Sequence, residues 1–346
     1  MKANLLNFIV CPICKNQFSL KTDKQIHNEI QEGCLICSKN HKFMISYGVP
    51  KLVIDKEKNF EKTESAFSSK WKTFNKSYHN KKWYESQKQW FLDRFGWKNF
   101  SNFKKFLSKC EYILDAGTGV GNSAHWFSIN NSSTVFAIDA SDSVIFANKK
   151  YGKIPNIHFL QADIRQLPFK KNFFDFICSD QVLHHTKDTK TSFLNLTKFL
   201  KKGGLISIYV YKIKGPIREF SDDYLRKIMV EKSEKECLKF SESMAKLGKI
   251  LTKVNKKIII PEDIPILKIK SGTYDLQRFI YWNFIKCWWS DDVPFAQSVA
   301  TNFDWYYPKF AFRHSSPEVK SWFRIAHLKI IHFKEIESGI NVSGKK

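Results

Sequence analysis

A glycine-rich loop that directly follows a short apolar run constrains the fold of this chain more than any other feature. The run Tyr112–Ala116 has the length and composition of a strand, and the residues GTGVGN follow it at 117–122. Glycine adopts backbone angles that other residues avoid, so this loop permits a tight turn from strand to helix and lets a ligand lie against bare backbone. We therefore expect a strand–loop–helix unit that binds a ligand.

The stretch 112–211 repeats this alternation of strand and helix. Further strands are expected at Thr134–Asp139, Ile157–Gln161, 173–178 and 205–211, with helices between them, including one over 141–150 and one that ends at Gly203 and Gly204. Strands separated by helices form βαβ units with right-handed crossovers and hence a parallel sheet. The predicted fold class is α/β, with a Rossmann-like, doubly wound and mostly parallel sheet.

Two aspartates stand at the ends of predicted strands. Asp139 closes the second strand, 18 residues past Gly121, and Asp163 follows the third. Open α/β sheets bind ligands at the carboxyl ends of their strands, where Asp139 is placed to accept hydrogen bonds from both hydroxyls of a ribose. The dinucleotide pattern G-x-G-x-x-G would need glycine at Asn122, so the loop is G-x-G-x-G, with Asp115 two residues ahead.

The motifs DAGTGVG, FAIDAS, LQADIRQLPF, FFDFICSDQVLHH and LKKGGLISIYVY extend this pattern over 112–211. With them the stretch resembles class I S-adenosylmethionine-dependent methyltransferases that have a methyltransferase-11 or UbiE-like domain. The resemblance implies a seven-stranded sheet, S-adenosylmethionine as cofactor and methyl transfer as the reaction. It also implies the cofactor-binding residues: Asp115, Gly117, Gly119 and Gly121 around the methionine part, Asp139 and Ala140 at the ribose, Asp163 and Ile164 at the adenine, and Ser179 near the methyl group.

Methyl transfer needs a general base only where the acceptor is a hydroxyl or a protonated amine. The catalytic candidates are Asp180, His184 and His185, just past the fourth predicted strand, and His314, ahead of a C-terminal helix. Each histidine also has a structural interpretation, as a helix cap, a partner of the backbone or part of a turn. The residues leave the choice between these roles open.

The first 57 residues hold four of the eight cysteines. Cys11 and Cys14 are spaced to grip one metal ion, and Cys34 and Cys37, or Cys37 and His41, can complete a Cys₄ or a Cys₃His zinc set. The alternative is a disulfide pair, but nothing in the sequence indicates an oxidising compartment. We expect a structural zinc ion, because so short a segment has little core and zinc binding supplies on the order of 10 kcal/mol of folding free energy.

The two ends of the chain resemble a group of bacterial methyltransferases with a short zinc-ribbon leader, through IQEGCLICSKNHKFMISYGVPKLV, FSSKWKTF and NFDWYYPKFAFRHSSPEVKSWFRIAHL. Their metal knuckle often ends in a histidine, which implies Cys11, Cys14, Cys37 and His41 as ligands and Cys34 as the rival fourth. The expected division is a zinc ribbon at 1–57, a helical cover at 58–108, the cofactor-binding core at 109–211, a helical substrate lid at 212–300, and a return helix with strands at 301–346.

The net charge of +24 raises the question of a nucleic-acid partner. The chain has 50 lysines but only 7 arginines, and its lysine comes with much Asn, Ile and Phe, all of which have A/T-rich codons. Phosphate-binding proteins favour arginine, whose planar fork suits that ligand. The leading hypothesis is therefore methylation of a small molecule or biosynthetic intermediate. The alternatives are an RNA methyltransferase that holds RNA through the ribbon and the lysines, and a non-catalytic cofactor-binding protein.

Tyr281, Trp282, Phe284, Trp288 and Trp289 surround Lys286 in the expected lid. They indicate a pocket for a planar, apolar or glycan-bearing acceptor, a surface that touches a membrane, or simply core between lid helices. No stretch approaches 18 uninterrupted apolar residues, and the N-terminal apolar patch is too short for a signal peptide. We expect a cytoplasmic protein, with peripheral membrane contact left open.

Overall fold

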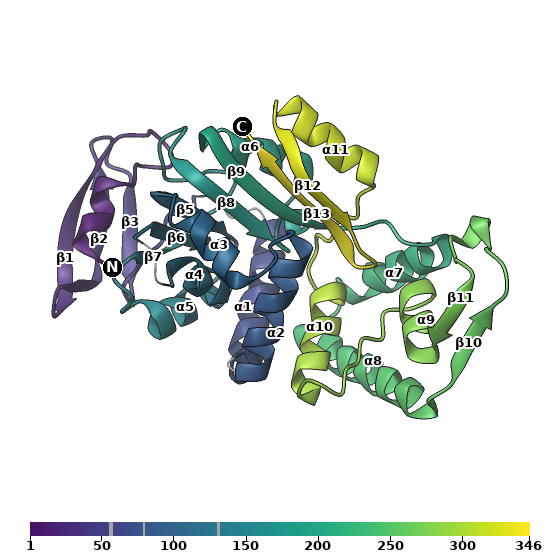
Figure 1. Ribbon diagram of the computed structural model, residues 1–346. Helices are drawn as coiled ribbons and strands as arrows, with labels where there is room; N and C mark the ends of the chain where they lie inside the picture. Colours follow the sequence, from purple (N-terminus) through teal and green to yellow (C-terminus); the bar gives the residue numbers. More distant parts are fainter. Residues whose placement is uncertain (55–57, 79, 130–131) are drawn as a thin grey trace.

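The computed structural model describes residues 1–54, 58–78, 80–129 and 132–346, without the side chains of 58–62, 71 and 75–78. A central sheet lies between an antiparallel sheet at the N-terminus and a largely helical unit at the other end of the molecule (Figure 1). The domain boundary expected at residue 57 falls outside the described residues.

The central sheet has seven strands in the order β12–β13–β9–β8–β5–β6–β7. Neighbouring strands from β9 to β7 are parallel, β13 is antiparallel to β9, and β12 is antiparallel to β13 and so runs in the same direction as the parallel strands. The strand order reverses direction between β5 and β8, the kind of switch point where open α/β sheets bind ligands. The bounds are β5 (Tyr112–Ala116), β6 (Thr134–Asp139), β7 (Ile157–Gln161), β8 (Phe174–Asp180), β9 (Leu200–Tyr211), β12 (Lys329–Glu335) and β13 (Gly339–Lys345). The predicted fold class is confirmed.

The strands β5, β6 and β7 have the predicted bounds, whereas β9 begins earlier than expected. The prediction of a helix that ends at Gly203 and Gly204 was wrong, because α6 (Thr189–Thr197) ends sooner and both glycines lie inside β9. Leu200 already pairs with Phe174 of β8, and a register shift follows. α5 (Ser143–Tyr151) also begins later than residue 141: its N-cap is Asp142, and the Ser141 hydroxyl donates to Asp139 and accepts from the Ser143 amide at 3.4 Å.

Helices cover both faces of the sheet. Alternate side chains of each strand point to opposite faces, so each strand contributes to two hydrophobic cores. Leu114 and Phe136 belong to a core shared with α6, α11 (Ser316–Ile325) and the N-terminal unit. Ile113 and Val135 belong to the opposite core, which is shared with α2, α3, α4 and α5. The bounds not yet given are α2 (Lys81–Arg94), α3 (Phe100–Leu107) and α4 (Asn122–Ser128).

The N-terminal unit covers the outer edge of the central sheet. After η1 (Ala3–Asn7) it forms a sheet in the order β1 (Phe18–Ile26), β2 (Glu29–Cys37), β3 (Lys42–Ser46) and β4 (Val49–Pro50). Past β4, Lys51 forms a parallel bridge with Gln161 of β7, and the Leu52 amide donates to the Gln161 carbonyl at 2.7 Å. An unpaired edge strand exposes backbone hydrogen-bonding groups, so this contact gives a hydrogen-bond partner to part of the exposed edge of β7.

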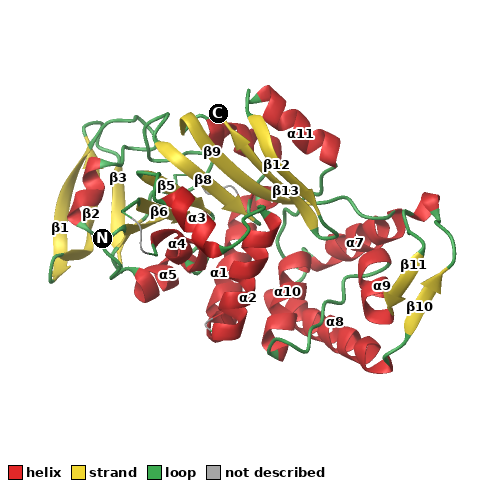
Figure 2. Cartoon of the chain, viewed as in Figure 1, coloured by secondary structure: helices red, strands yellow, loops and turns green. Residues whose placement is uncertain are grey.

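The remaining helices lie over the carboxyl ends of the parallel strands. Residues 212–300 are mostly helical, with a short hairpin at the outer end (Figure 2), and α10 runs across the boundary expected at residue 300. The bounds are α1 (Lys58–Tyr78), η2 (Leu183–His185), α7 (Pro216–Met229), α8 (Glu234–Val254), β10 (Lys257–Ile260), η3 (Pro265–Leu267), β11 (Gly272–Asp275), α9 (Leu276–Asn283) and α10 (Phe295–Tyr306).

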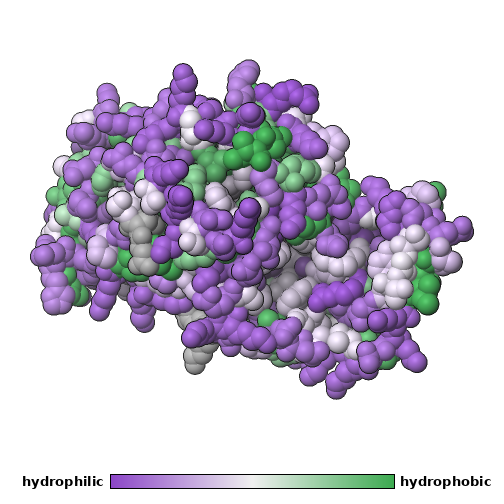
Figure 3. All heavy atoms as spheres, viewed as in Figure 1, coloured by the Kyte–Doolittle hydropathy of each residue, from purple (hydrophilic) through white to green (hydrophobic). Residues whose placement is uncertain are grey.

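Hydrophilic residues cover most of the face seen in Figure 3. Among the described residues, no helix combines the length and the apolar character needed to cross a membrane.

Truncation of Phe136 tests whether the N-terminal unit and the sheet share one core. This side chain is fully buried, and its ring centroid lies 5.3 Å from that of Phe8 and 5.1 Å from that of Phe169. Phe136→Ala should lower the free energy of unfolding by about 3–5 kcal/mol, because it leaves a cavity among these rings. Urea denaturation checks this.

The matched control is Phe220→Ala, whose side chain is 74% exposed on α7. Its free energy of unfolding should change by about 0.5 kcal/mol or less. Equal losses in the two variants would contradict the shared core.

Candidate functional site

A cavity of about 600 Å³ opens at the carboxyl ends of β5, β6 and β8. The glycine loop and the ends of these strands form one wall, α1 and α2 form another, and α9 and α10 of the lid line the far side. Small-molecule sites commonly enclose roughly 300–1,000 Å³. The cavity therefore has the size of a site for small ligands.

The glycine loop is held tightly between strand and helix. Gly117 has a φ of +95°, and a Cβ on it would lie 2.2 Å from a methyl group of Val182. Gly121 has a φ of +81° at the N-cap of α4, where a Cβ would lie 2.9 Å from that of Ala147. Any other residue at these positions would be strained and would push the loop away from the sheet.

The carboxylate of Asp139 fixes the position of the loop. Its Oδ2 accepts a hydrogen bond from the Gly119 amide at 2.9 Å, and its Oδ1 accepts from the amide (2.9 Å) and the hydroxyl (2.6 Å) of Ser141. A carboxylate oxygen can accept more than one hydrogen bond, so Oδ2 keeps room for a donor from a ligand. Asp139 thus shapes the site and faces the cavity.

Asp115 lines the cavity but is almost completely buried. The Ser123 hydroxyl donates to its Oδ2 at 2.6 Å. Burial raises the pKa of Asp115 to about 6, because the charged form loses hydration. A cation bound beside this carboxyl would favour its ionised form.

The other predicted cofactor residues divide between the cavity wall and the protein interior. Ala140, Asp163 and Ile164 line the cavity, and Asp163 accepts hydrogen bonds from the backbone (2.7 Å) and Nε (2.8 Å) of Arg165. Ser179 is fully buried and donates to the Ala116 carbonyl at 3.1 Å. Seven of the nine residues therefore lie on the wall, namely Asp115, Gly117, Gly119, Asp139, Ala140, Asp163 and Ile164.

Asp180 lines the cavity in a bidentate ion pair that the sequence did not reveal. Both of its oxygens accept from the guanidinium of Arg94 in α2, each at 2.8 Å. Arg94 is 2% exposed and stacks on Trp90, 3.6 Å from the ring centroid. The signal in the sequence that could have pointed to Arg94 is the scarcity of arginine in this lysine-rich chain, since only arginine donates two parallel hydrogen bonds to a carboxylate.

His185 lines the same cavity with a defined tautomer. Its Nδ1 lies 2.7 Å from the Phe310 carbonyl oxygen. A carbonyl can only accept, so Nδ1 carries the proton and Nε2 keeps a lone pair. Burial lowers the pKa of His185 to about 3, so the ring is neutral at pH 7.

The other two histidine candidates lie in the protein interior. His184 is fully buried and stacks on Tyr211, with 3.6 Å between the ring centroids. His314 lies with its Nδ1 2.9 Å from an oxygen of Glu318, at the start of α11. Neither side chain lines the cavity.

The lid contributes an aromatic and polar wall. Of the predicted cluster, Tyr281, Trp282 and Trp288 line the cavity with Lys286, whereas Phe284 and Trp289 do not. An ion pair of 2.5 Å between Lys70 of α1 and Asp304 of α10 joins the cover to the lid. Further lining residues that sequence reasoning missed are Thr63, Phe67, Tyr209, Tyr211, Gln297 and Thr301.

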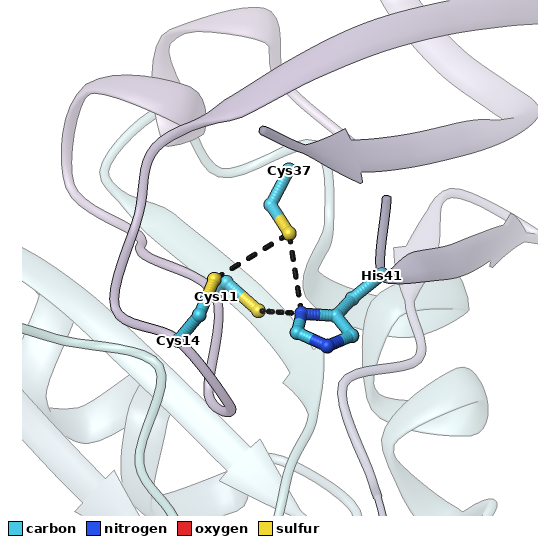
Figure 4. Close-up of side chains that lie close together, drawn as sticks. All are labelled: Cys11, Cys14, Cys37 and His41. Carbon is cyan, nitrogen blue, oxygen red and sulfur yellow. Dashed lines mark hydrogen bonds between the residues drawn. The ribbon is translucent and has the colours of Figure 1, made fainter. Parts of the chain in front are cut away.

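The N-terminal unit brings together Cys11, Cys14, Cys37 and His41 (Figure 4). Their ligand atoms all lie within 4.8 Å of one another. His41 Nδ1 is 3.5 Å from the sulfur of Cys11 and 3.3 Å from that of Cys37, and the sulfurs of Cys14 and Cys37 are 3.5 Å apart. Cys34 is outside this group, with its sulfur 3.6 Å from the Leu35 carbonyl.

These separations fit a tetrahedral zinc ion. Zinc–sulfur and zinc–nitrogen bonds of about 2.3 and 2.0 Å place neighbouring ligand atoms roughly 3.5–3.8 Å apart. Three thiolates and one imidazole are a common structural set for zinc. The site therefore fits the metal that the sequence predicts.

Comparison with known proteins agrees with this architecture. Residues 114–208 match the family described as "Methyltransferase domain", and residues 2–45 match the family described as "Trm112p-like protein". A sterol 24-C-methyltransferase of Pneumocystis carinii is 25% identical over 164 residues, which cover 44% of this chain and 42% of that protein.

The ubiquinone/menaquinone biosynthesis C-methyltransferase UbiE of Vibrio cholerae is 26% identical over 136 residues, which cover 37% of this chain and 52% of that protein. The matched region thus spans about half the length of these relatives. A solved complex of the Haloferax volcanii Trm112 methyltransferase activator and a methyltransferase aligns with 84% of this chain and 99% of that chain, at 14% identity and a TM-score of 0.41.

The family matches confirm the resemblance found in the motifs of 112–211. The chain therefore carries a methyltransferase domain at 114–208, preceded by a Trm112p-like domain at 2–45.

Proposed function

We propose that this protein is an S-adenosylmethionine-dependent methyltransferase that acts on a small molecule or a biosynthetic intermediate. The observation that carries the proposal is the continuity of the cavity. The glycine loop and strand-end acids of the methyltransferase domain share one continuous cavity with the aromatic wall of the lid. A cofactor and a planar acceptor can thus meet inside it.

The residues on the strand side suit S-adenosylmethionine. Asp139 has acceptor capacity left for ribose hydroxyls, and Asp163 with Ile164 would flank the adenine. Asp115 would face the methionine amine, whose positive charge favours the ionised carboxylate. When bound, the cofactor supplies an electrophilic methyl group.

The residues on the acceptor side of the cavity would mainly align the acceptor with the cofactor and surround it. Orientation of two reactants can contribute roughly 7–11 kcal/mol to a displacement reaction. The neutral His185 would accept a proton at Nε2 if the acceptor is a hydroxyl. Asp180, held by Arg94, is the second candidate for a polar contact with the acceptor. The interior positions of His184 and His314 favour structural roles for both.

Cys11, Cys14, Cys37 and His41 would hold a structural zinc ion. Four protein ligands fill a tetrahedral site and leave no open position for chemistry.

We also propose that the protein is cytoplasmic and that the chain divides into five parts. These are a zinc ribbon (1–57), a helical cover (58–108), the cofactor-binding core (109–211), a helical substrate lid (212–300), and a return helix with strands (301–346).

A second candidate is an RNA methyltransferase. The Trm112p-like match and the net charge of +24 favour it. The aromatic wall of the cavity favours a small, planar acceptor instead. A third candidate, a non-catalytic cofactor-binding protein, would bind the cofactor without turnover.

Methyl-labelled S-adenosylmethionine, supplied with an extract of the source organism, separates these candidates. Label in the small-solute or lipid fraction would support the proposal, and it should disappear with Asp139→Ala. RNase-sensitive label in the RNA fraction would support the second candidate. Cofactor binding with no labelled product would leave the third.

Asp139→Ala should weaken binding of S-adenosylhomocysteine at least about tenfold, because it removes a charged acceptor and releases the Gly119 amide. Isothermal titration calorimetry measures this dissociation constant. Asp142→Ala is the matched control, since this exposed acid lies three residues on and does not line the cavity. Equal affinities for the two variants would argue against the ribose contact.

The affinity for S-adenosylhomocysteine should depend on pH through Asp115. The pKa of this carboxyl is about 6 in the free protein, so below pH 6 it is mostly neutral. Binding of the positively charged amine favours the ionised form, so affinity should rise as the pH increases from 5 to 7 and then level off. Titrations at several pH values test this, and Asp115→Asn should remove the dependence; an unchanged profile in that variant would contradict the assignment.

The purified protein should contain about one zinc ion per chain, measured by mass spectrometry of the metal content. Cys37→Ser should lose the metal and lower the melting temperature, whereas Cys34→Ser should keep it. Loss of zinc in Cys34→Ser with retention in a His41→Ala variant would instead make Cys34 the fourth ligand.

A further inference from the structure

Three buried cations lie together at the lid end of the cavity. Lys214, Arg218 and Lys286 are 8%, 0% and 7% exposed, respectively. Removing a charge from water is costly unless a partner replaces the lost hydration. The hydrogen-bond and ion-pair partners of these three groups therefore show whether the protein itself compensates their positive charges.

Arg218 has two hydrogen-bond partners. Its Nε donates to Asp222 at 2.8 Å, and its Nη1 donates to the Tyr281 carbonyl. Asp222 is itself fully buried, so the two side chains form a neutral pair. The other oxygen of Asp222, Oδ1, has no hydrogen-bond partner among the described residues, but within them no carboxylate lies within 4.0 Å of the Lys214 or Lys286 ammonium.

Lys214 is affected by the surplus of positive charge. Its ammonium lies 3.5 Å from the Lys212 carbonyl and 4.4 Å from the centroid of the Trp305 ring. Burial, together with the charges of Arg218 and Lys286, holds the pKa of Lys214 well below its usual range, although Asp222 and Glu219 act in the opposite direction. The surroundings of Lys214 thus disfavour a further cation.

Lys286 is the member of the cluster that lines the cavity. Its ammonium lies 3.3 Å from the Tyr281 hydroxyl and 5.0 Å from the centroid of Trp305. Within the described part of the chain, no carboxylate comes within 4.0 Å of this ammonium. The acid of the lid wall, Asp304, is already paired with Lys70 at 2.5 Å.

A second buried group points to the same ligand space. Gln297 of α10 is 1% exposed and lines the cavity, and its Oε1 has no hydrogen-bond partner among the described residues. Buried polar atoms in proteins are nearly always hydrogen-bonded, so this unpartnered amide oxygen on a cavity wall indicates a ligand that also carries a hydrogen-bond donor, apart from any anionic group. Tyr281, Trp282 and Trp288 supply flat apolar surfaces around it.

We propose that Lys286 binds an anionic oxygen group of the acceptor, so that the substrate class is a planar compound with a carboxylate or a phosphate. An ammonium has three donors, and the Tyr281 hydroxyl uses only one. An anion in the cavity would compensate the buried charge of Lys286, and the aromatic wall would hold the planar part of the acceptor. This inference rests on the proposed function, because it assigns the acceptor end of the same cavity.

The test compares 1-naphthoate with 1-naphthamide, which has nearly the same shape but no charge. Calorimetry in the presence of saturating S-adenosylhomocysteine should give at least tenfold tighter binding of naphthoate to the wild-type protein. Lys286→Met should weaken naphthoate binding about tenfold, leave naphthamide binding unchanged and keep the affinity for S-adenosylhomocysteine. Lys246→Met, at an exposed lid position whose side chain is 61% accessible, is the matched control and should change neither ligand.

Equal binding of the two probes by the wild-type protein, or no binding of naphthoate, would overturn the inference even if Lys286→Met fails to fold. An equal loss of both probes in a folded Lys286→Met variant would also overturn it. Absence of S-adenosylhomocysteine binding by the wild-type protein would instead contradict the proposed function, whatever the preference for naphthoate.

Discussion

The hydrogen bonds of the Asp139 carboxylate hold together the parts of the molecule on which the site depends. One oxygen binds the amide of Gly119 in the loop after β5, and the other binds Ser141 at the start of the next crossover. The loop can lie this close only because Gly117 and Gly121 adopt left-handed conformations against Val182 and against Ala147 of α5, respectively. A carboxylate that arranges the backbone in this way presents its remaining lone pairs to a ligand in a fixed direction.

The rest of the chain encloses that arrangement. The N-terminal unit covers the β7 edge and shares a core with the sheet through Phe136, which supports the strands that carry Asp139 and Asp163. On the open side, α1, α9 and α10 complete the cavity, and the Lys70–Asp304 pair links cover to lid. The cofactor end and the acceptor end of the cavity are therefore built from segments that lie far apart in the sequence.

Features set by local sequence could be predicted, and features set by long-range contacts could not. The strands β5, β6 and β7 were predicted with their bounds because parallel strands buried on both faces read as apolar runs that end at polar residues. The early start of β9 was missed because the pairing of Leu200 with β8 outweighs the two glycines. Arg94 lies 86 residues before its partner Asp180, and no pattern near either residue joins them. His184 and His185 are adjacent, yet only tertiary packing decides which one faces the cavity.

A crystal structure of the protein with S-adenosylhomocysteine would test the assignment of the cofactor site most directly. The ligand should occupy the cavity at the ends of β5 and β6, with its ribose hydroxyls on Asp139 and its amine beside Asp115. Space should remain between the ligand sulfur and the wall formed by His185, Tyr281 and Lys286. A ligand bound elsewhere, or one that fills the lid end of the cavity and leaves Asp139 without contact, would contradict this assignment.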